Sequence, residues 1–170
     1  MTMKLSSIVA TSLLAECALA QSANDSRWTN EAVFQDSILN TTNGYREEHG
    51  AHDVHWNATL ASFAKSYLDR SSCKFAHSHG PYGENLAAGY VAPASAIRAF
   101  GEERKSYNFS NPNWQPRGGH FTQLVWKKTN AIGCAAKHCG KRMRWYLVCE
   151  YSPRGNVIGA FKSNVGRKIR

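Results

Sequence analysis

The stretch Gly119-His-Phe-Thr-Gln-Leu-Val-Trp126 holds one ionisable side chain, His120, in a run that is otherwise apolar or neutral. An imidazole in such a run is expected to be at least half buried, and a buried polar group needs a hydrogen-bonding partner. Three upstream residues could supply one, namely His77, Glu84 and Glu103. The stretch therefore predicts a polar site set into a hydrophobic body.

These four residues allow more than one interpretation. Two imidazoles can ligate Zn²⁺ or Cu²⁺ while a carboxylate orients each of them, and the same groups could do acid–base work on a bound water. The residues alone favour a simpler interpretation, in which each histidine is a separate, hydrogen-bonded polar residue. Serine catalysis has little support, because the chain contains no Gly-x-Ser-x-Gly elbow.

Residues 1–20 are typical of a secretory signal peptide. Lys4 gives a basic start, residues 5–15 form a short apolar core, and Ala18-Leu-Ala20 is a small-x-small cleavage site. The core is too short to span a bilayer, and no later segment predicts a membrane-spanning helix. We expect an exported, extracellular protein that begins at Gln21 and forms one domain.

Charge and cysteine content narrow the class further. The formal net charge of +9 favours acidic cell-surface components as partners, and no nucleic-acid motif accompanies it. With Cys17 in the signal peptide, four cysteines remain, an even number that predicts disulfides in an exported chain. Composition leaves three pairings open for Cys73, Cys134, Cys139 and Cys149. Four sequons predict glycosylation, at Asn24, Asn40, Asn57 and Asn108.

Hydrophobic spacing predicts three helices, over 29–48, from Asn57 onward, and from Pro93 or Ala94 to about Tyr107. Asn57 suits an N-cap and Pro93 a first turn. Ranges 131–136 and 144–151 predict strands that a turn near Gly140 joins as a hairpin. The expected inward faces are Phe34, Ile38, Thr41 and Tyr45; Leu60, Phe63, Ala64, Tyr67 and Leu68; and Ile97, Phe100, Arg104 and Tyr107. Helices first and strands later indicate an α+β fold.

The segment 107–114 places three rings, Tyr107, Phe109 and Trp114, in or beside a loop rich in Pro and Asn. Such rings either pack against the core or form the wall of an apolar ligand groove. The residues alone leave both interpretations open.

The stretch 119–126 resembles the first signature box of the CAP superfamily, which comprises cysteine-rich secretory, venom-allergen and pathogenesis-related proteins. Residues 147–156, Leu-Val-Cys-Glu-Tyr-Ser-Pro-Arg-Gly-Asn, resemble the second box. His77-Ser, Gly83-Glu-Asn-Leu-Ala and Ile132-Gly-Cys also match in order and spacing. The resemblance covers about 30–165 as a CAP (SCP) domain, which leaves a flexible segment at 21–29 and a solvated basic tail at 166–170. The short form is most similar to fungal and plant pathogenesis-related members.

The resemblance implies a disulfide-stabilised α-β-α sandwich with the bridges Cys73–Cys139 and Cys134–Cys149. It also implies that His77, Glu84, Glu103 and His120 converge in a surface cleft, where His77 and His120 would hold a divalent metal such as zinc. The cysteines of a third bridge found in plant members are absent here, which points to the fungal branch.

Two departures from the family pattern stand out. Glu150 occupies a position in the second box that is usually a neutral Asn, His or Gln. Phe100-Gly101 replaces a Trp-Tyr pair that many members carry before the helix glutamate, so the floor of the groove is expected to differ. Glu103, rather than Glu102, matches that glutamate, because its spacing to Tyr107 fits.

Fungal members of the superfamily bind sterols, and some bind fatty acids, through a mobile loop whose aromatic spacing Tyr107, Phe109 and Trp114 reproduce. The resemblance thus implies a secreted, monomeric, non-enzymatic protein that binds sterols and related small lipids for export, detoxification or host interaction. One alternative is a metal-dependent hydrolase built on the two histidines and two glutamates. Another is a recognition ligand that binds a cell-wall or host-surface component.

Overall fold

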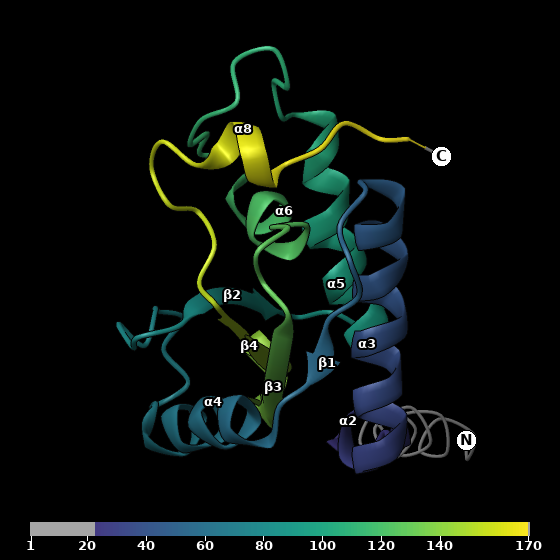
Figure 1. Ribbon diagram of the computed structural model, residues 1–170. Helices are drawn as coiled ribbons and strands as arrows, with labels where there is room; N and C mark the ends of the chain where they lie inside the picture. Colours follow the sequence, from purple (N-terminus) through teal and green to yellow (C-terminus); the bar gives the residue numbers. More distant parts are fainter. Residues whose placement is uncertain (1–22, 170) are drawn as a thin grey trace, which may run out of the picture.

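The computed structural model describes residues 23–169 (Figure 1). The expected signal peptide and Cys17 lie outside this range. Within it, no helix has the length and apolar character that crossing a membrane requires.

The described chain forms helices and four strands in mixed order. The helices are α2 (Ser26–Thr29), α3 (Glu31–Glu48), α4 (Ala58–Arg70), α5 (Pro93–Glu102), the 3-10 helix η1 (Glu103–Lys105), α6 (Gly119–Leu124), α7 (Gly140–Met143) and α8 (Phe161–Asn164). The strands are β1 (His55–Trp56), β2 (Gly83–Ala88), β3 (Ala131–His138) and β4 (Trp145–Ser152).

The four strands form one mixed sheet in the order β1-β3-β4-β2. β1 pairs with β3 in parallel, and β4 pairs in antiparallel fashion with both β3 and β2. Helix α4 packs on β3 and β4, whereas α3, α5 and α6 lie beyond the other face of the sheet (Figure 1). The α+β prediction and its α-β-α layering are therefore confirmed.

Two glycines allow neighbouring elements to pack closely, one between α4 and the sheet and one between the helices α5 and α3. A Cβ at Gly133 would lie 2.3 Å from the backbone nitrogen of Ala61, so only glycine lets α4 sit this near to β3. A Cβ at Gly101 would lie 2.4 Å from the ring of Tyr45, so α5 meets α3 at a glycine as well. Gly101 belongs to the pair that departs from the family pattern, and the Tyr45 ring occupies the space that a larger side chain would need.

Two disulfides join the segments that the resemblance implies. Cys134 and Cys149 stand directly opposite each other on β3 and β4, and they tie the two central strands together. Cys73 is bonded to Cys139, which anchors the loop after α4 to the turn before α7. This bridge spans 66 residues of sequence, a separation at which a cross-link removes about 4 kcal/mol of chain entropy from the unfolded state.

A buried arginine connects α3 to the stretch 119–126, which contains α6. Arg46 is fully buried, and its guanidinium donates hydrogen bonds to four backbone carbonyls. Three acceptors lie at the end of α6 and just after it, at Leu124 (3.0 Å), Trp126 (3.0 Å) and Thr129 (2.7 Å). Burial lowers the pKa of Arg46 to about 10, so the group is still charged at neutral pH. Arg46 therefore satisfies carbonyls that would otherwise be buried without donors.

Some sequence-based expectations were wrong in detail. The buried face of α3 is Phe34, Ile38, Thr42 and Arg46. Thr41 was expected on this face, but its neighbour Thr42 is the buried residue. The third helix starts at Pro93 as expected but ends as an α-helix at Glu102, before η1. The strands β1 and β2 and the short helices α6 and α8 were not anticipated, because none of them carries a full amphipathic period or a β-branched run.

The segment 21–29 was expected to be flexible, but its described part is packed. Trp28 lies in α2, is 6% exposed and stacks on Trp145 with ring centroids 5.2 Å apart. Its indole N–H donates to the carbonyl of Val91 at 3.2 Å. The ring thus anchors the start of the described chain to the start of β4.

The basic tail is also less free than expected. The carbonyl of Gly166 lies 2.9 Å from the buried imidazole of His49, and the N–H of Ile169 donates to the carbonyl of Glu48 at 2.8 Å. Arg167 lies over the ring of Phe109. These contacts hold the described part of the tail, 166–169, along the end of α3.

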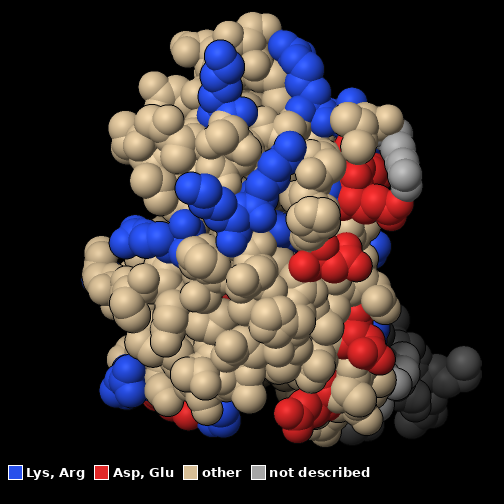
Figure 2. Space-filling model, in the orientation of Figure 1, with Lys and Arg blue, Asp and Glu red and all other residues tan. Residues whose placement is uncertain are grey.

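Charge is unevenly distributed over the surface. On the face drawn in Figure 2, Lys and Arg side chains spread over the upper and middle part, whereas Asp and Glu gather along the side formed by α3. On this face, the positive charge therefore lies away from α3.

Arg46→Ala is expected to destabilise the protein by about 3–5 kcal/mol, because four buried carbonyls lose their donors. Arg46→Lys should also destabilise it, because one ammonium group cannot donate to all four carbonyls that the planar guanidinium reaches. Urea unfolding measures both effects. Arg70→Ala, at the exposed end of α4, is the matched control and should cost about 0.5 kcal/mol or less. An Arg46→Lys protein as stable as wild type would contradict the role given to the guanidinium.

Candidate functional site

His120 stands in the first turn of α6 and is paired with Glu103. The two side chains meet at 2.6 Å between Nδ1 and Oε1. The other carboxylate oxygen accepts the backbone N–H groups of His120 (3.0 Å) and Phe121 (3.2 Å). Because Gly118 offers α6 no side-chain cap, Glu103 serves as the cap from another element. Glu103, not Glu102, is therefore the partner that reaches the opening stretch.

The rest of the His120 environment fixes its orientation. Its ring stacks on Phe100, with centroids 4.9 Å apart. Asn85 on β2 donates a hydrogen bond to the His120 carbonyl at 3.0 Å. The imidazole is 39% exposed, as the sequence predicted for a half-buried histidine. With Nδ1 directed at Glu103, the Nε2 atom is the ring nitrogen left to meet a ligand.

His77 and Glu84 form a second pair, at the start of β2. Nδ1 of His77 lies 2.5 Å from Oε1 of Glu84, and the carboxylate also accepts the N–H of Ser78 at 3.0 and 3.2 Å. Glu84 is 7% exposed, whereas His77 is 57% exposed. The Glu84 carboxylate thus holds the loop that precedes β2, and the His77 imidazole lies between this carboxylate and the solvent.

The two pairs line different hollows of the surface. Glu103 and His120 border a hollow of about 380 Å³ beside β2, which we call the β2 hollow. His77 and Glu84 border a more polar hollow of about 280 Å³, the Trp114 hollow. Within residues 23–169, no three or more His, Cys, Asp or Glu side chains are arranged to hold a metal ion. A protein ligand set for zinc is therefore incomplete in this arrangement, since structural and catalytic zinc sites use three or four protein ligands.

The β2 hollow continues into a second apolar hollow. Its lining residues are Phe75, Leu86, Ala87, Ala88, Tyr90, Ala99, Phe100, Glu103 and His120. The neighbouring α7 hollow, of about 400 Å³, is lined by Cys73, Phe75, Ala88, Gly89, Cys139, Arg142 and Met143. Since Phe75 and Ala88 belong to both, the two hollows adjoin along the outer edge of β2. We call the combined feature the edge groove.

The three rings of the aromatic loop do not share one surface. Tyr107 is 5% exposed and packs on Phe109 and Phe121. Phe109 also stacks on His49, so it belongs to the packing between the loop and α3. Trp114 alone is half exposed, where it borders the Trp114 hollow. Two of the three rings predicted to bind sterol therefore pin the loop to the core.

Glu150, the departure in the second box, is a fully buried carboxyl group. It lies on the central strand β4, directly opposite Glu84 on β2. No donor within the described chain reaches either of its oxygen atoms. Burial, and then the neighbouring Glu84 carboxylate, hold the pKa of Glu150 well above its ordinary value of 4.5. As a neutral acid, Glu150 can donate its own proton to Glu84, which resolves the missing hydrogen bond.

The four predicted glycosylation sites differ in access. Asn24, Asn40 and Asn108 are exposed. Asn57 is half buried, and its side chain accepts the N–H groups of Thr59 and Leu60 as the N-cap of α4. A glycan on Asn57 would compete with this cap.

Glu103→Ala should destabilise the fold by about 1–2 kcal/mol, because α6 loses its cap and His120 loses its partner. Glu103→Gln keeps an acceptor and should cost less. Thermal unfolding measures both variants against Lys105→Ala, which removes only a surface ion pair two residues away. If Glu103→Ala were no worse than the control, the capping role would be wrong.

The buried Glu150 predicts a dependence of stability on pH. Its folded-state pKa is raised, so the stability that its proton contributes is complete below about pH 4.5 and is lost as the pH rises. Glu150→Gln keeps a donor towards Glu84 and removes the ionisable group. The variant should therefore gain stability relative to wild type between pH 5 and pH 8, by at most about 1.4 kcal/mol per pH unit.

Urea unfolding at several pH values measures this difference. Glu31→Gln, at an exposed position of α3, is the control and should follow wild type at every pH. Parallel curves for wild type and Glu150→Gln would mean that Glu150 is not held in its neutral form.

Comparison with known proteins identifies the family. The model of the Cysteine-rich secretory protein family (CAP) matches residues 39–151. Protein PRY2 of Saccharomyces cerevisiae is 44% identical over 135 residues, which cover 78% of this chain and 41% of the relative. Secreted protein RBT4 of Candida albicans is 39% identical over 145 residues, which cover 81% of this chain and 39% of the relative. The chain thus spans less than half the length of these two fungal proteins.

The fold agrees with this assignment. The solved structure of NaASP2 with Zn²⁺ superposes with a TM-score of 0.62 at 21% identity, and the match covers 79% of this chain and 86% of that one. Its low identity makes it evidence for the fold alone. Together with the family match over most of the domain, these likenesses show that the chain belongs to the CAP family of cysteine-rich secretory proteins.

Proposed function

We propose that this chain is a secreted protein that binds sterols and related small hydrophobic compounds without catalysing a reaction on them. The observation that carries the proposal is the edge groove, whose two hollows of about 380 and 400 Å³ adjoin at Phe75 and Ala88. Ligand sites in proteins are commonly apolar hollows of this size with a few polar groups at one end. Here the polar groups are Glu103 and His120.

The exposed apolar surface of the groove supports the same proposal. Phe75 is 52% exposed. Exposing an apolar ring to water is unfavourable compared with burying it. Phe75 stands over Tyr146, with ring centroids 5.5 Å apart, so it is held at the groove rather than folded into the core. A bound sterol would cover this ring and gain roughly 25 cal/mol for each Å² of apolar surface removed from water.

The histidine–glutamate pairs support a structural role better than a catalytic one. Each carboxylate already accepts backbone N–H groups, at the start of α6 and in the loop before β2. Both glutamates therefore stabilise the walls of the site. Within residues 23–169 the two pairs are not joined by a third side chain that could complete a metal site, which weighs against the metal-dependent hydrolase.

Secretion is part of the proposal. The two disulfides are of the kind that persists in oxidising compartments, and the name of one relative describes it as a secreted protein. Residues 1–20, the expected signal peptide, belong to the same argument.

Ala88→Phe tests the site, because the new ring would fill the place where the two hollows meet. Saturable binding of radiolabelled sterol is expected for wild type, with affinity lowered by about tenfold or more in Ala88→Phe. Trp114→Ala should retain binding within about threefold, since Trp114 borders the other hollow.

The controls distinguish a wrong location of the binding site from a wrong function. Circular dichroism and the melting temperature show whether Ala88→Phe still folds, and Ala88→Val is the smaller change at the same position. Binding lost in Trp114→Ala but kept in Ala88→Phe would move the site to the aromatic loop. Wild-type protein without saturable sterol binding would refute the proposed function.

Zinc binding by His77 and His120 is a separate proposal with a separate test. The relative solved with Zn²⁺ motivates it, but the two histidines lie at different hollows and lack a third protein ligand within the described chain. Calorimetric titration with zinc should show a site that His77→Ala and His120→Ala each abolish. Unchanged titration curves in both variants would exclude this ligand pair.

A further inference from the structure

The turn at α7 gathers positive charge at one end of the edge groove. Lys141, Arg142 and Arg144 are exposed and lie within four consecutive positions that also include Met143. Arg142 and Met143 line the α7 hollow itself. None of the three cations has an ion pair or a side-chain hydrogen bond to another residue of 23–169.

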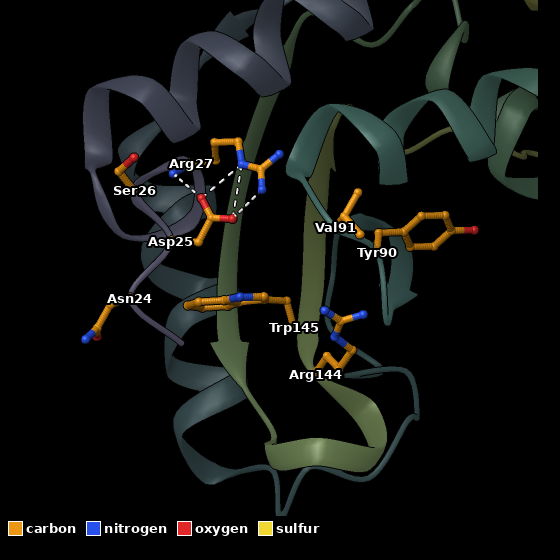
Figure 3. Close-up of a pocket in the computed structure, with 8 residues that line it drawn as sticks. All are labelled: Asn24, Asp25, Ser26, Arg27, Tyr90, Val91, Arg144 and Trp145. Atoms are coloured by element: carbon orange, nitrogen blue, oxygen red, sulfur yellow. Dashed lines mark hydrogen bonds and ion pairs between the residues drawn. The ribbon is translucent and has the colours of Figure 1, made fainter. Parts of the chain in front are cut away.

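Some other cations of the molecule are neutralised by nearby acids. Arg27 is held by Asp25 in the hollow drawn in Figure 3, where dashed lines join the two side chains. Arg104 is paired with both Glu48 and Glu102. In the same close-up, Arg144 lies beside Trp145 with its guanidinium unpaired. The charge of the α7 turn is thus available to a ligand.

The position of the turn relative to the groove is fixed by covalent and hydrogen bonds. Cys139, directly before α7, is bonded to Cys73, and both residues line the α7 hollow. The N–H of Gly89 donates to the carbonyl of Trp145 at 3.0 Å, which joins the end of β2 to the start of β4. The backbone of the α7 turn is therefore held in place beside the apolar surface before a ligand binds.

The two ends of the edge groove differ in charge. The α7 end carries Arg142, whereas the far end of the β2 hollow carries the carboxylate of Glu103 beside His120. An anionic group placed at the far end would meet Glu103, but at the α7 end it would meet guanidinium groups, which form strong bonds with carboxylates, sulfates and phosphates. This difference in charge between the two ends favours an anionic ligand, with its anionic group at the α7 end.

We propose that the α7 turn binds the anionic head group of a lipid whose apolar body lies in the edge groove, so that the ligand class is a sterol or acyl chain carrying one carboxylate or sulfate. Arg142 is the principal contact, and Arg144 assists from the side of Tyr90. This inference rests on the proposed function, because it assigns a head group to a ligand that the same groove binds.

The test compares two ligands that differ only in the head group, cholesterol and cholesterol sulfate, each below its aggregation threshold. Wild-type protein should bind the sulfate roughly tenfold more tightly at low salt, with the preference shrinking as salt rises. Arg142→Gln/Arg144→Gln should abolish this preference, because the binding of cholesterol sulfate is weakened about tenfold more than that of cholesterol. Palmitate against hexadecanol repeats the comparison for a carboxylate on an acyl chain.

A charge-matched control separates a local contact from net charge. Arg117→Gln/Lys162→Gln removes two exposed cations that line neither hollow of the groove, and it should retain the full preference for the sulfate. A preference lowered equally in both double variants would overturn the inference in favour of a general charge effect.

The remaining outcomes distinguish the two proposals. Cholesterol and cholesterol sulfate bound with equal affinity would overturn the head-group assignment and leave the groove as the lipid site. Binding of neither would refute the proposed function. If the Arg142/Arg144 variant kept adsorption to phosphatidylserine vesicles but lost its preference for the dissolved sulfate ligand, the head-group assignment would stand. Loss of vesicle adsorption with no effect on dissolved ligands would replace it with a membrane-docking surface.

Discussion

The structure depends on the buried guanidinium of Arg46. It joins α3 to the carbonyls at and after the end of α6, where the chain leaves the opening stretch and turns towards β3. A helix end leaves carbonyls without partners, and burying them is tolerable only if a donor reaches them. One planar, charged group does this for several carbonyls at once. Because α6 carries His120 at its other end, the position of the candidate site follows from how Arg46 anchors this helix.

The need of buried backbone groups for hydrogen-bond partners also explains the two glutamates that the resemblance placed in the site. Glu103 supplies the acceptor that the first N–H groups of α6 need, and Glu84 supplies one for the loop before β2. Arg46 and Glu103 thus satisfy opposite ends of a helix of six residues, which is too short to be stable without tertiary partners. Glu150 extends the arrangement inward, since a neutral acid beneath Glu84 provides a donor where an ionised one would only repel it. A residue pattern that resembles a catalytic or metal centre is here largely accounted for by backbone groups that need partners.

The sequence predicted the elements that carry their own signals. Asn57 and Pro93 marked the starts of two helices, and the β-branched and aromatic runs at 131–136 and 144–151 marked the central hairpin. It could not predict β2, because Gly-Glu-Asn-Leu-Ala-Ala has no strand periodicity and becomes a strand only by pairing with β4. It could not predict a buried Arg46 either, since three of its acceptors lie 78 to 83 residues further along the chain. The spacing of Tyr107, Phe109 and Trp114 was informative about a family pattern, but only the packing on Phe121 and His49 shows which rings are free.

The location of the groove follows from the topology of the sheet. β2 is an edge strand, so one of its sides has no neighbouring strand to bury it. Proteins usually protect such an edge with charge or with a covering segment, and here the cover is partial: Phe75 stands over one part, and α5 closes another through Phe100. The Cys73–Cys139 bridge keeps the loop that carries Phe75 near the edge, while the cations of the α7 turn, which have no ion pair within 23–169, make the α7 end of the groove positively charged. Covered in this way, the edge of β2 does not readily pair with a second strand. The part left uncovered is the hollow that Phe75 and Phe100 line, and it belongs to the groove that we propose as the lipid site.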